Sequence, residues 1–187
     1  MLDADNNFGK TSLSTDRRRF NMPDKTTLQR AKKDKREGKS PTTQAGEFVH
    51  EEIKHIREGK HGARSAKQAI AIGLSKARRA GVDLPPPKEG TVSKKTRKSA
   101  ASAYRAGQSG DHHVSQTRSR ATRKALKHEG RAAASSTALS RQAHAAAARK
   151  PASERAAAAR KAVSTKGATA RSTAAKKAAR TRARRGS

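Results

Sequence analysis

Cysteine and tryptophan are absent from this chain of 187 residues, and the other large aromatics amount to three phenylalanines and one tyrosine. Without cysteine the chain forms no disulfide, thiolate metal site or cysteine nucleophile. Long apolar runs are missing too, because none approaches the roughly 20 residues of a membrane span. The first residues do not join a basic segment to an apolar one, as a secretory signal does. We therefore expect a soluble cytoplasmic protein with no membrane partner.

Acidic residues are also scarce. Lys and Arg number 45 against 15 Asp and Glu, a formal net charge of +30. Residues 1–90 hold 20 basic and 12 acidic residues (net +8), whereas residues 91–187 hold 25 and 3 (net +22). Low hydrophobicity with high charge cannot offset the ordering entropy of a whole chain. The composition predicts a small folded element in a largely disordered chain that binds a polyanion, by default nucleic acid.

Two stretches have the apolar spacing of amphipathic helices. The first has Ser40-Pro41 as N-cap and first helical residue, and its apolar residues fall on one face: Ala45, Phe48, Val49, Ile53 and Ile56. The second has the capping pair Ser65 and Gln68, and Gly81 ends it in the manner of a Schellman motif. We expect an all-α fold, a small helical hairpin with helices at about 41–58 and 65–80.

The hairpin has a small core. Its larger apolar candidates are Phe48, Val49, Ile53, Ile56, Ile70, Leu74, Val82 and Leu84. At roughly 2 kcal/mol each, they do not balance the ordering of the chain. Small residues on the second helix permit close helix–helix approach. A third helix, a ligand or a second copy is needed, and we expect a homodimer through the hairpin as one solution.

The composition divides the chain into four parts. We expect a disordered N-terminus (1–25), a small helical domain (26–84) that begins with a solvated charged helix, a Pro/Lys linker (85–97) and a basic low-complexity tail (98–187). The tail is rich in helix-forming alanine but has no apolar stripe, so its helices are expected to form only when an anion neutralises the charge.

The tail carries the strongest functional signal, because many Lys and Arg side chains that neutralise phosphates give affinity without sequence reading. Arg outnumbers Lys, which favours forked phosphate contacts. The tail has one aromatic, Tyr104, so base stacking is disfavoured and duplex DNA is preferred over RNA. The predicted contacts are Lys94, Lys95, Arg97, Lys98, Arg105, Arg118, Arg120, Arg123, Lys124, Lys127, Arg141, Arg149, Lys150, Arg160, Lys161, Lys176, Lys177, Arg180, Arg182, Arg184 and Arg185.

The hairpin offers a weaker nucleic-acid signal. A helix-turn-helix interpretation makes 65–80 the recognition helix, but the connection GKHGAR is longer than the usual turn. A packing or dimerisation element fits better, with Lys76, Arg78 and Arg79 as secondary phosphate contacts.

The segment HEEIKH (50–55) resembles a zinc-protease motif without matching it. That motif needs histidines at i and i+4, whereas His50 and His55 are five apart, about 140° around a helix. Glu51 and His55 do have i, i+4 spacing, and His61 lies nearby, but ordinary polar pairing explains them. No catalytic triad, P-loop or dinucleotide loop is visible. We expect no enzyme activity, no metal and no cofactor.

Residues 46–87 resemble a small family of uncharacterised bacterial proteins. Its hallmark is a His/Glu/Lys-rich helix, a short loop and then QAIAIGLS-x-AR-x-AG, which matches residues 68–75, 77–78 and 80–81. Members with basic tails are commonly labelled DNA-binding, and the resemblance implies no activity beyond that. The tail is similar in composition to those of linker histones and bacterial histone-like proteins.

These observations favour a histone-like, nucleoid-associated protein that binds DNA without sequence preference. Two alternatives stay open: an RNA- or ribosome-associated basic protein, and a sequence-specific regulator that uses the hairpin.

Overall fold

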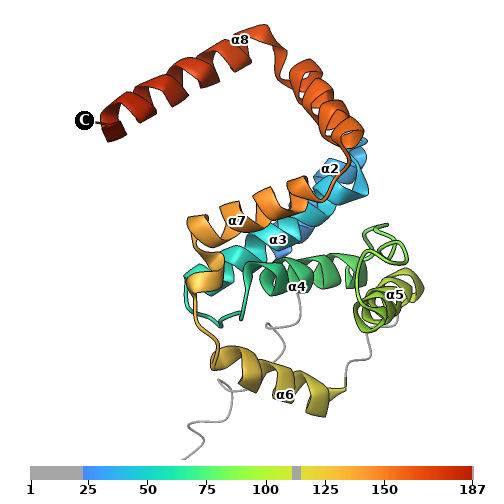
Figure 1. Ribbon diagram of the computed structural model, residues 1–187. Coiled ribbons are helices and arrows are strands. Elements are labelled where there is room, and N and C mark those ends of the chain that lie inside the picture. Colours follow the sequence, from blue (N-terminus) through green and yellow to red (C-terminus); the bar gives the residue numbers. More distant parts are fainter. Residues whose placement is uncertain (1–22, 111–114, 187) are drawn as a thin grey trace, which may run out of the picture. The chain divides into compact units, whose positions relative to one another are not determined.

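The computed structural model describes residues 23–110 and 115–186, and all regular structure in these residues is helical (Figure 1). The all-α fold class is confirmed. The elements are α2 (Lys25–Arg36), α3 (Pro41–Arg57), α4 (Ala66–Arg79), α5 (Lys94–Ser109), α6 (Gln116–Lys127), the short 3₁₀ helix η1 (Ala132–Ala134), α7 (Ser136–Ala148) and α8 (Ala152–Gly186). The predicted disordered N-terminus lies, up to residue 22, outside the described residues.

Two compact units divide the chain, Met1–Leu139 and Ser140–Ser187. We describe each by itself. Among the helices of the described parts, none combines the length and the apolar character needed to cross a membrane.

The predicted hairpin is present as α3 and α4, with ends within one residue of those expected. Pro41 is the first residue of α3, and Ser65 caps α4 because its Oγ accepts a hydrogen bond from the Gln68 N–H (3.2 Å). At the end of α4, Gly81 has φ +83° and the Val82 N–H donates to the Ala77 carbonyl (3.1 Å). Local capping chemistry therefore sets both ends of α4, whereas the Ser40 side chain makes no capping hydrogen bond to α3.

Small residues bring α3 and α4 together, and the two helices lie side by side in Figure 1. Ala69 and Ala77 of α4 are fully buried. A Cβ atom at Gly73 would lie 2.7 Å from the Val49 Cα and 3.0 Å from the Phe48 carbonyl oxygen. The two backbones are thus in contact, which only glycine permits at this position.

Two apolar clusters flank this contact. One joins α2, α3 and α4 to the segment after α4 and consists of buried Ala31, Ala45, Phe48, Ala77 and Val82, with Leu28, Leu74, Ala80 and Leu84 packed against it. The other consists of buried Ile53, Ile56, Ala63, Ala69, Ala133 and Ala134, with Val49 and Leu139 beside it. Seven of the eight predicted core residues belong to these clusters, and Ile70 does not.

The sequence suggested that the first helix, α2, is solvated. In the structure it packs on α3 instead. It begins at Lys25 and buries Thr27, Ala31 and Asp34. Its apolar face is narrow, yet a buried alanine and threonine are enough to fill the space beside Phe48. The hairpin thus obtains its third helix from the same chain.

The packed unit also extends beyond the boundary expected at residue 84. Instead of a linker over 85–97 and a tail from 98, α5 packs on α4 and buries Ala100 and Ala103. Gly107 of α5 lies directly against the Arg78 carbonyl. Arg57 donates from Nε to the Ala134 carbonyl (2.8 Å) and so holds η1 against α3. Alanine and glycine make these contacts without the wide apolar stripe that sequence analysis requires.

The unit Ser140–Ser187 contains the rest of α7 and all of α8. Gly167 interrupts α8 with φ 64° and ψ 167°, which bends the helix there. From Pro151 to Arg184 every side chain is exposed except that of Ala178, which is half-buried. The described part of this unit therefore has no apolar core.

Two glycine substitutions test the close α3–α4 contact. Gly73→Ala places a methyl group against backbone atoms, so we expect it to lower the free energy of unfolding by about 1–3 kcal/mol. Gly46 is an exposed helical glycine with nothing near its absent Cβ, and Gly46→Ala is expected to raise stability by about 0.5–1 kcal/mol. Urea unfolding followed by circular dichroism measures both. A Gly73→Ala protein as stable as the Gly46→Ala protein would contradict the contact.

Candidate functional site

The basic side chains of α7 and α8 form an open cationic surface. Among the predicted contacts in this region, all through Arg184 are exposed, and the side chain of Arg185 lies outside the described residues. Three cations that the sequence prediction omitted, Arg155, Lys166 and Arg171, are exposed on the same helix. Between residues 140 and 187 the sequence has 14 basic residues and one acidic residue, Glu154.

Some cations of the first unit, in contrast, have carboxylate partners. Lys39 lies 2.7 Å from Asp34 and 2.8 Å from Glu37, and this contact lowers the pKa of the Glu37 carboxyl. Lys60 pairs with Glu58 at 3.2 Å, and the contact lowers the Glu58 pKa as well. Part of the positive charge of this unit is therefore paired internally.

The predicted contacts on α5 and α6 are mostly exposed as well. Lys94, Lys95, Lys98 and Arg105 are exposed on α5, and Arg97 lies 3.8 Å from Glu89. On α6 the exposed members are Arg118, Arg120, Lys124 and Lys127, whereas Arg123 is half-buried. These cations belong to helices of the first unit, not to the tail that the sequence predicted.

The hairpin cations are placed differently from the prediction. Lys76 and Arg78 are buried, and only Arg79 is exposed. Arg78 donates to the carbonyls of Leu84 (3.0 Å) and Pro85 (3.3 Å) and so holds the extended segment after α4. The prediction that Lys76 and Arg78 contact phosphates from the hairpin surface does not fit this burial, because their charged ends face groups of the protein.

Lys76 belongs to a buried polar cluster, which we define as Glu51, Glu52, His55, His61 and Lys76. Glu52 has no exposed surface, and its Oε2 lies 2.7 Å from Lys76 Nζ. Its Oε1 lies 3.2 Å from His61 Nε2. A single carboxylate thus contacts an ammonium from α4 and an imidazole from the loop between the helices.

The other half of the cluster lies toward the start of α2. Glu51 accepts a hydrogen bond from the Asp24 N–H (3.1 Å), and its Oε1 lies 3.9 Å from His55 Nδ1. His55 Nε2 lies 3.5 Å from the Asp24 carboxylate. Burial lowers the pKa of His55, and the charges of Lys60 and Lys76 lower it further. The carboxylates of Glu51 and Asp24 oppose this shift in the pKa, but the net direction is downward, which favours the neutral imidazole.

The arrangement differs from the one that helix spacing suggested. His50 is exposed, whereas His61, in the loop after α3, lies 6.4 Å from His55, centroid to centroid, with the rings edge to face. The spacing of residues within α3 cannot reveal that His61, which lies in the following loop, packs back against α3. The sequence indicated the i, i+4 pair Glu51 and His55, with His61 nearby, but not the contact between His61 and Glu52.

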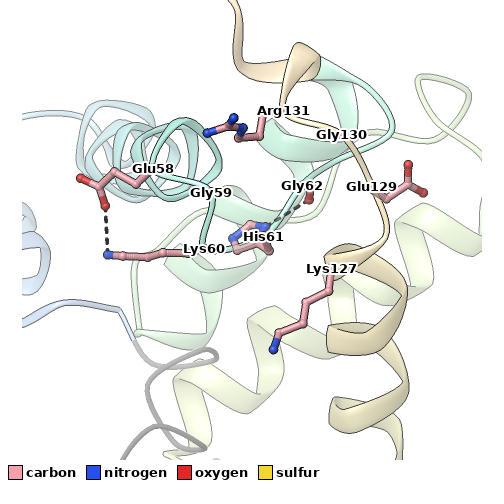
Figure 2. Close-up of a pocket in the computed structure, with 9 residues that line it drawn as sticks. All are labelled: Glu58, Gly59, Lys60, His61, Gly62, Lys127, Glu129, Gly130 and Arg131. Atoms are coloured by element: carbon pink, nitrogen blue, oxygen red, sulfur yellow. Dashed lines mark hydrogen bonds and ion pairs between the residues drawn. The ribbon is translucent and has the colours of Figure 1, made fainter.

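A pocket of about 710 Å³ opens beside His61 (Figure 2). It lies between residues 58–62 and residues 127–131, two segments joined by hydrogen bonds from the N–H groups of Gly62 and Ala63 to the carbonyls of Leu126 and Gly130. Figure 2 shows the His61 ring in the wall, with Lys60 and Lys127 at the rim. Basic and acidic side chains alternate around it, so the pocket favours neither sign of charge strongly.

Replacement of Lys76 tests the role of the buried ammonium. Lys76→Met leaves the Glu52 carboxylate buried without its closest cation, so we expect unfolding to become easier by about 3–5 kcal/mol. The matched control is Lys67→Met on the exposed side of α4, with an expected change within about 0.5 kcal/mol. Chemical denaturation of the full chain gives both values. Equal stability of the two variants would exclude a structural role for Lys76.

Comparison with known proteins finds a family match for one part of the chain. Residues 30–88 match the model of a family of unknown function (DUF6496). This range spans α3 and α4 and most of α2, so it coincides with the packed hairpin and includes the whole buried polar cluster except for its contact with Asp24. A search of curated proteins and a search of solved structures found no match.

Proposed function

We propose that this protein binds duplex DNA without sequence preference and that the cations of α8, with those that precede it, make most of the phosphate contacts. The observation that carries the proposal is the uncompensated charge of α8. This helix has 11 basic residues and one acidic residue, and its basic side chains are exposed through Arg184. Such a charge attracts a polyanion, and each phosphate contact releases condensed counterions.

The arrangement of cations around α8 supports a phosphate partner over a protein groove. Neighbouring residues on a helix project about 100° apart, so Arg160 and Lys161 point in different directions, as do Lys176 and Lys177. No side of the helix is reserved for apolar residues, apart from the exposed Val163. A helix with positive charge on all sides fits the backbone of DNA and leaves no face for docking in an apolar groove.

The aromatic residues favour a duplex over single strands. After Tyr104 the sequence has no Phe, Tyr or Trp, and the Tyr104 hydroxyl donates to Asp83 at 2.7 Å. Bases of a single strand therefore find no aromatic platform on α6, α7 or α8. The burial of Lys76 and Arg78 removes two of the four cations of α4 from a recognition surface, which disfavours sequence-specific reading by α4. A nucleoid-associated, histone-like role follows from this mode of binding.

A pair of variants with equal charge change tests the proposal. In the first, Lys161, Lys166, Arg171 and Lys177 of α8 are replaced by glutamine. In the second, the exposed α2 residues Lys25, Lys32, Lys35 and Arg36 are replaced by glutamine. Affinity for duplex DNA is measured across a salt series. In a plot of log K against the logarithm of the salt concentration, we expect the slope for the α8 variant to be shallower by roughly 0.9 for each phosphate contact removed. The slope for the α2 variant should change much less.

Two results would contradict the proposal. Equal losses in both variants would mean that net charge alone attracts the DNA, without a particular role for α8. A discrete footprint on one sequence would favour a specific regulator. Competition with structured RNA decides the remaining alternative, because an RNA- or ribosome-associated protein would release the duplex at low RNA concentrations.

A further inference from the structure

We propose that Glu52, His55 and His61 form a structural zinc-binding site between α3 and the loop that follows it. Each offers one ligand atom, the three atoms lie within 4.8 Å of one another, and all three residues are buried. In a tetrahedral site with bonds of about 2.0–2.1 Å the ligand atoms are roughly 3.4 Å apart. The separation between the atoms would need to shorten by up to about 1.4 Å to reach that spacing. The site is independent of DNA binding by α8.

The hydrogen bond of His61 determines which of its nitrogens is the ligand. Nδ1 lies 3.1 Å from the Gly62 carbonyl oxygen. A carbonyl only accepts, so Nδ1 carries the hydrogen, and in the neutral ring the lone pair is then on Nε2. Nε2 is the atom that lies 3.2 Å from Glu52 Oε1. A lone pair and a carboxylate oxygen repel each other at this distance, so a cation between them is favoured.

An outer partner of this kind is typical of metal-binding histidines. The Gly62 carbonyl, which accepts a hydrogen bond from Nδ1, fixes the tautomer and the orientation of the His61 ring. Glu52 has its own outer partner, because Lys76 lies 2.7 Å from Oε2 while Oε1 faces His61. The two oxygens thus divide their roles, one toward the ammonium and the other toward the metal.

Burial without hydrogen bonds is the second, independent observation. Both Glu52 oxygens are inaccessible to solvent, and neither has a hydrogen-bond partner in the described part of the chain. A buried carboxylate in this state is costly unless cations surround it. Among the buried groups, Lys76 supplies one positive charge against the two negative charges of Glu51 and Glu52, and the exposed Asp24 and Lys60 add one charge of each sign at the edge of the cluster. A bound cation offsets the remaining negative charge.

The donor set favours zinc over calcium or magnesium. Two imidazoles and one carboxylate are the His₂Glu set found in zinc sites, whereas the harder ions prefer oxygen ligands. The Glu51 carboxylate, whose Oε1 also lacks a hydrogen-bond partner among the described residues, or a water molecule from the pocket beside His61 completes four ligands. Zinc here would join the loop to α3 and so stabilise the packed unit.

The experiment uses the full chain, dialysed against a chelator and titrated with Zn²⁺ and Co²⁺. We expect one tight equivalent by calorimetry, visible Co²⁺ absorption of tetrahedral intensity, and a zinc-dependent rise in the unfolding midpoint. Glu52→Gln and His61→Gln each remove a direct ligand and should weaken binding by more than the roughly 10–100-fold that loss of an outer partner costs. His50→Gln, an exposed histidine on α3, should leave binding unchanged.

Three outcomes would overturn the proposal: no stoichiometric binding, equal loss in the His50→Gln protein, or ring-nitrogen NMR that shows a proton on both His61 nitrogens with zinc present. The last result would mean that a proton, not a metal, lies between His61 and Glu52. If Glu52→Gln fails to fold, X-ray absorption on the wild-type zinc complex still decides, because it counts the imidazole ligands, and fewer than two would contradict the site.

Discussion

The contact between α3 and α4 at Gly73 is the constraint on which the rest of the first unit depends. Because no side chain separates the two helices at Gly73, the two backbones meet, and Val49 and Phe48 fill the space around it. This close approach brings Lys76 within 2.7 Å of Glu52 and allows the loop after α3 to place His61 beside the same carboxylate. The apolar clusters lie on either side of this contact.

The two units differ in how their basic side chains are placed. In the first unit, acidic residues pair with some of the cations, and Lys76 and Arg78 are used inside the protein. In the unit that contains α8, acidic residues are almost absent and the basic side chains are exposed. An internal core needs paired charge because desolvation is costly, whereas the phosphate-binding surface that we propose needs unpaired charge. The two requirements explain why the composition changes along the chain.

Sequence reasoning predicted those features that local chemistry determines. The caps at Ser65 and Gly81 and the apolar face of α3 indicated both helices to within a residue, because capping and periodicity act over a few positions. It did not predict the packing of α5 and η1, because alanine is both a good helix former and a small core residue, and its role depends on what lies opposite. The burial of Lys76 and the approach of His61 to Glu52 depend on the helix crossing and on a loop, which periodicity does not encode.

The central proposal, that α8 is the main DNA-binding element, is tested most directly by hydrogen exchange with and without duplex DNA. An unpacked helix exchanges its amide hydrogens readily, and contact with phosphates should slow this exchange. The account predicts that DNA slows exchange across α8 and leaves α3 and α4 unchanged. Protection confined to α4, with α8 unaffected, would contradict it.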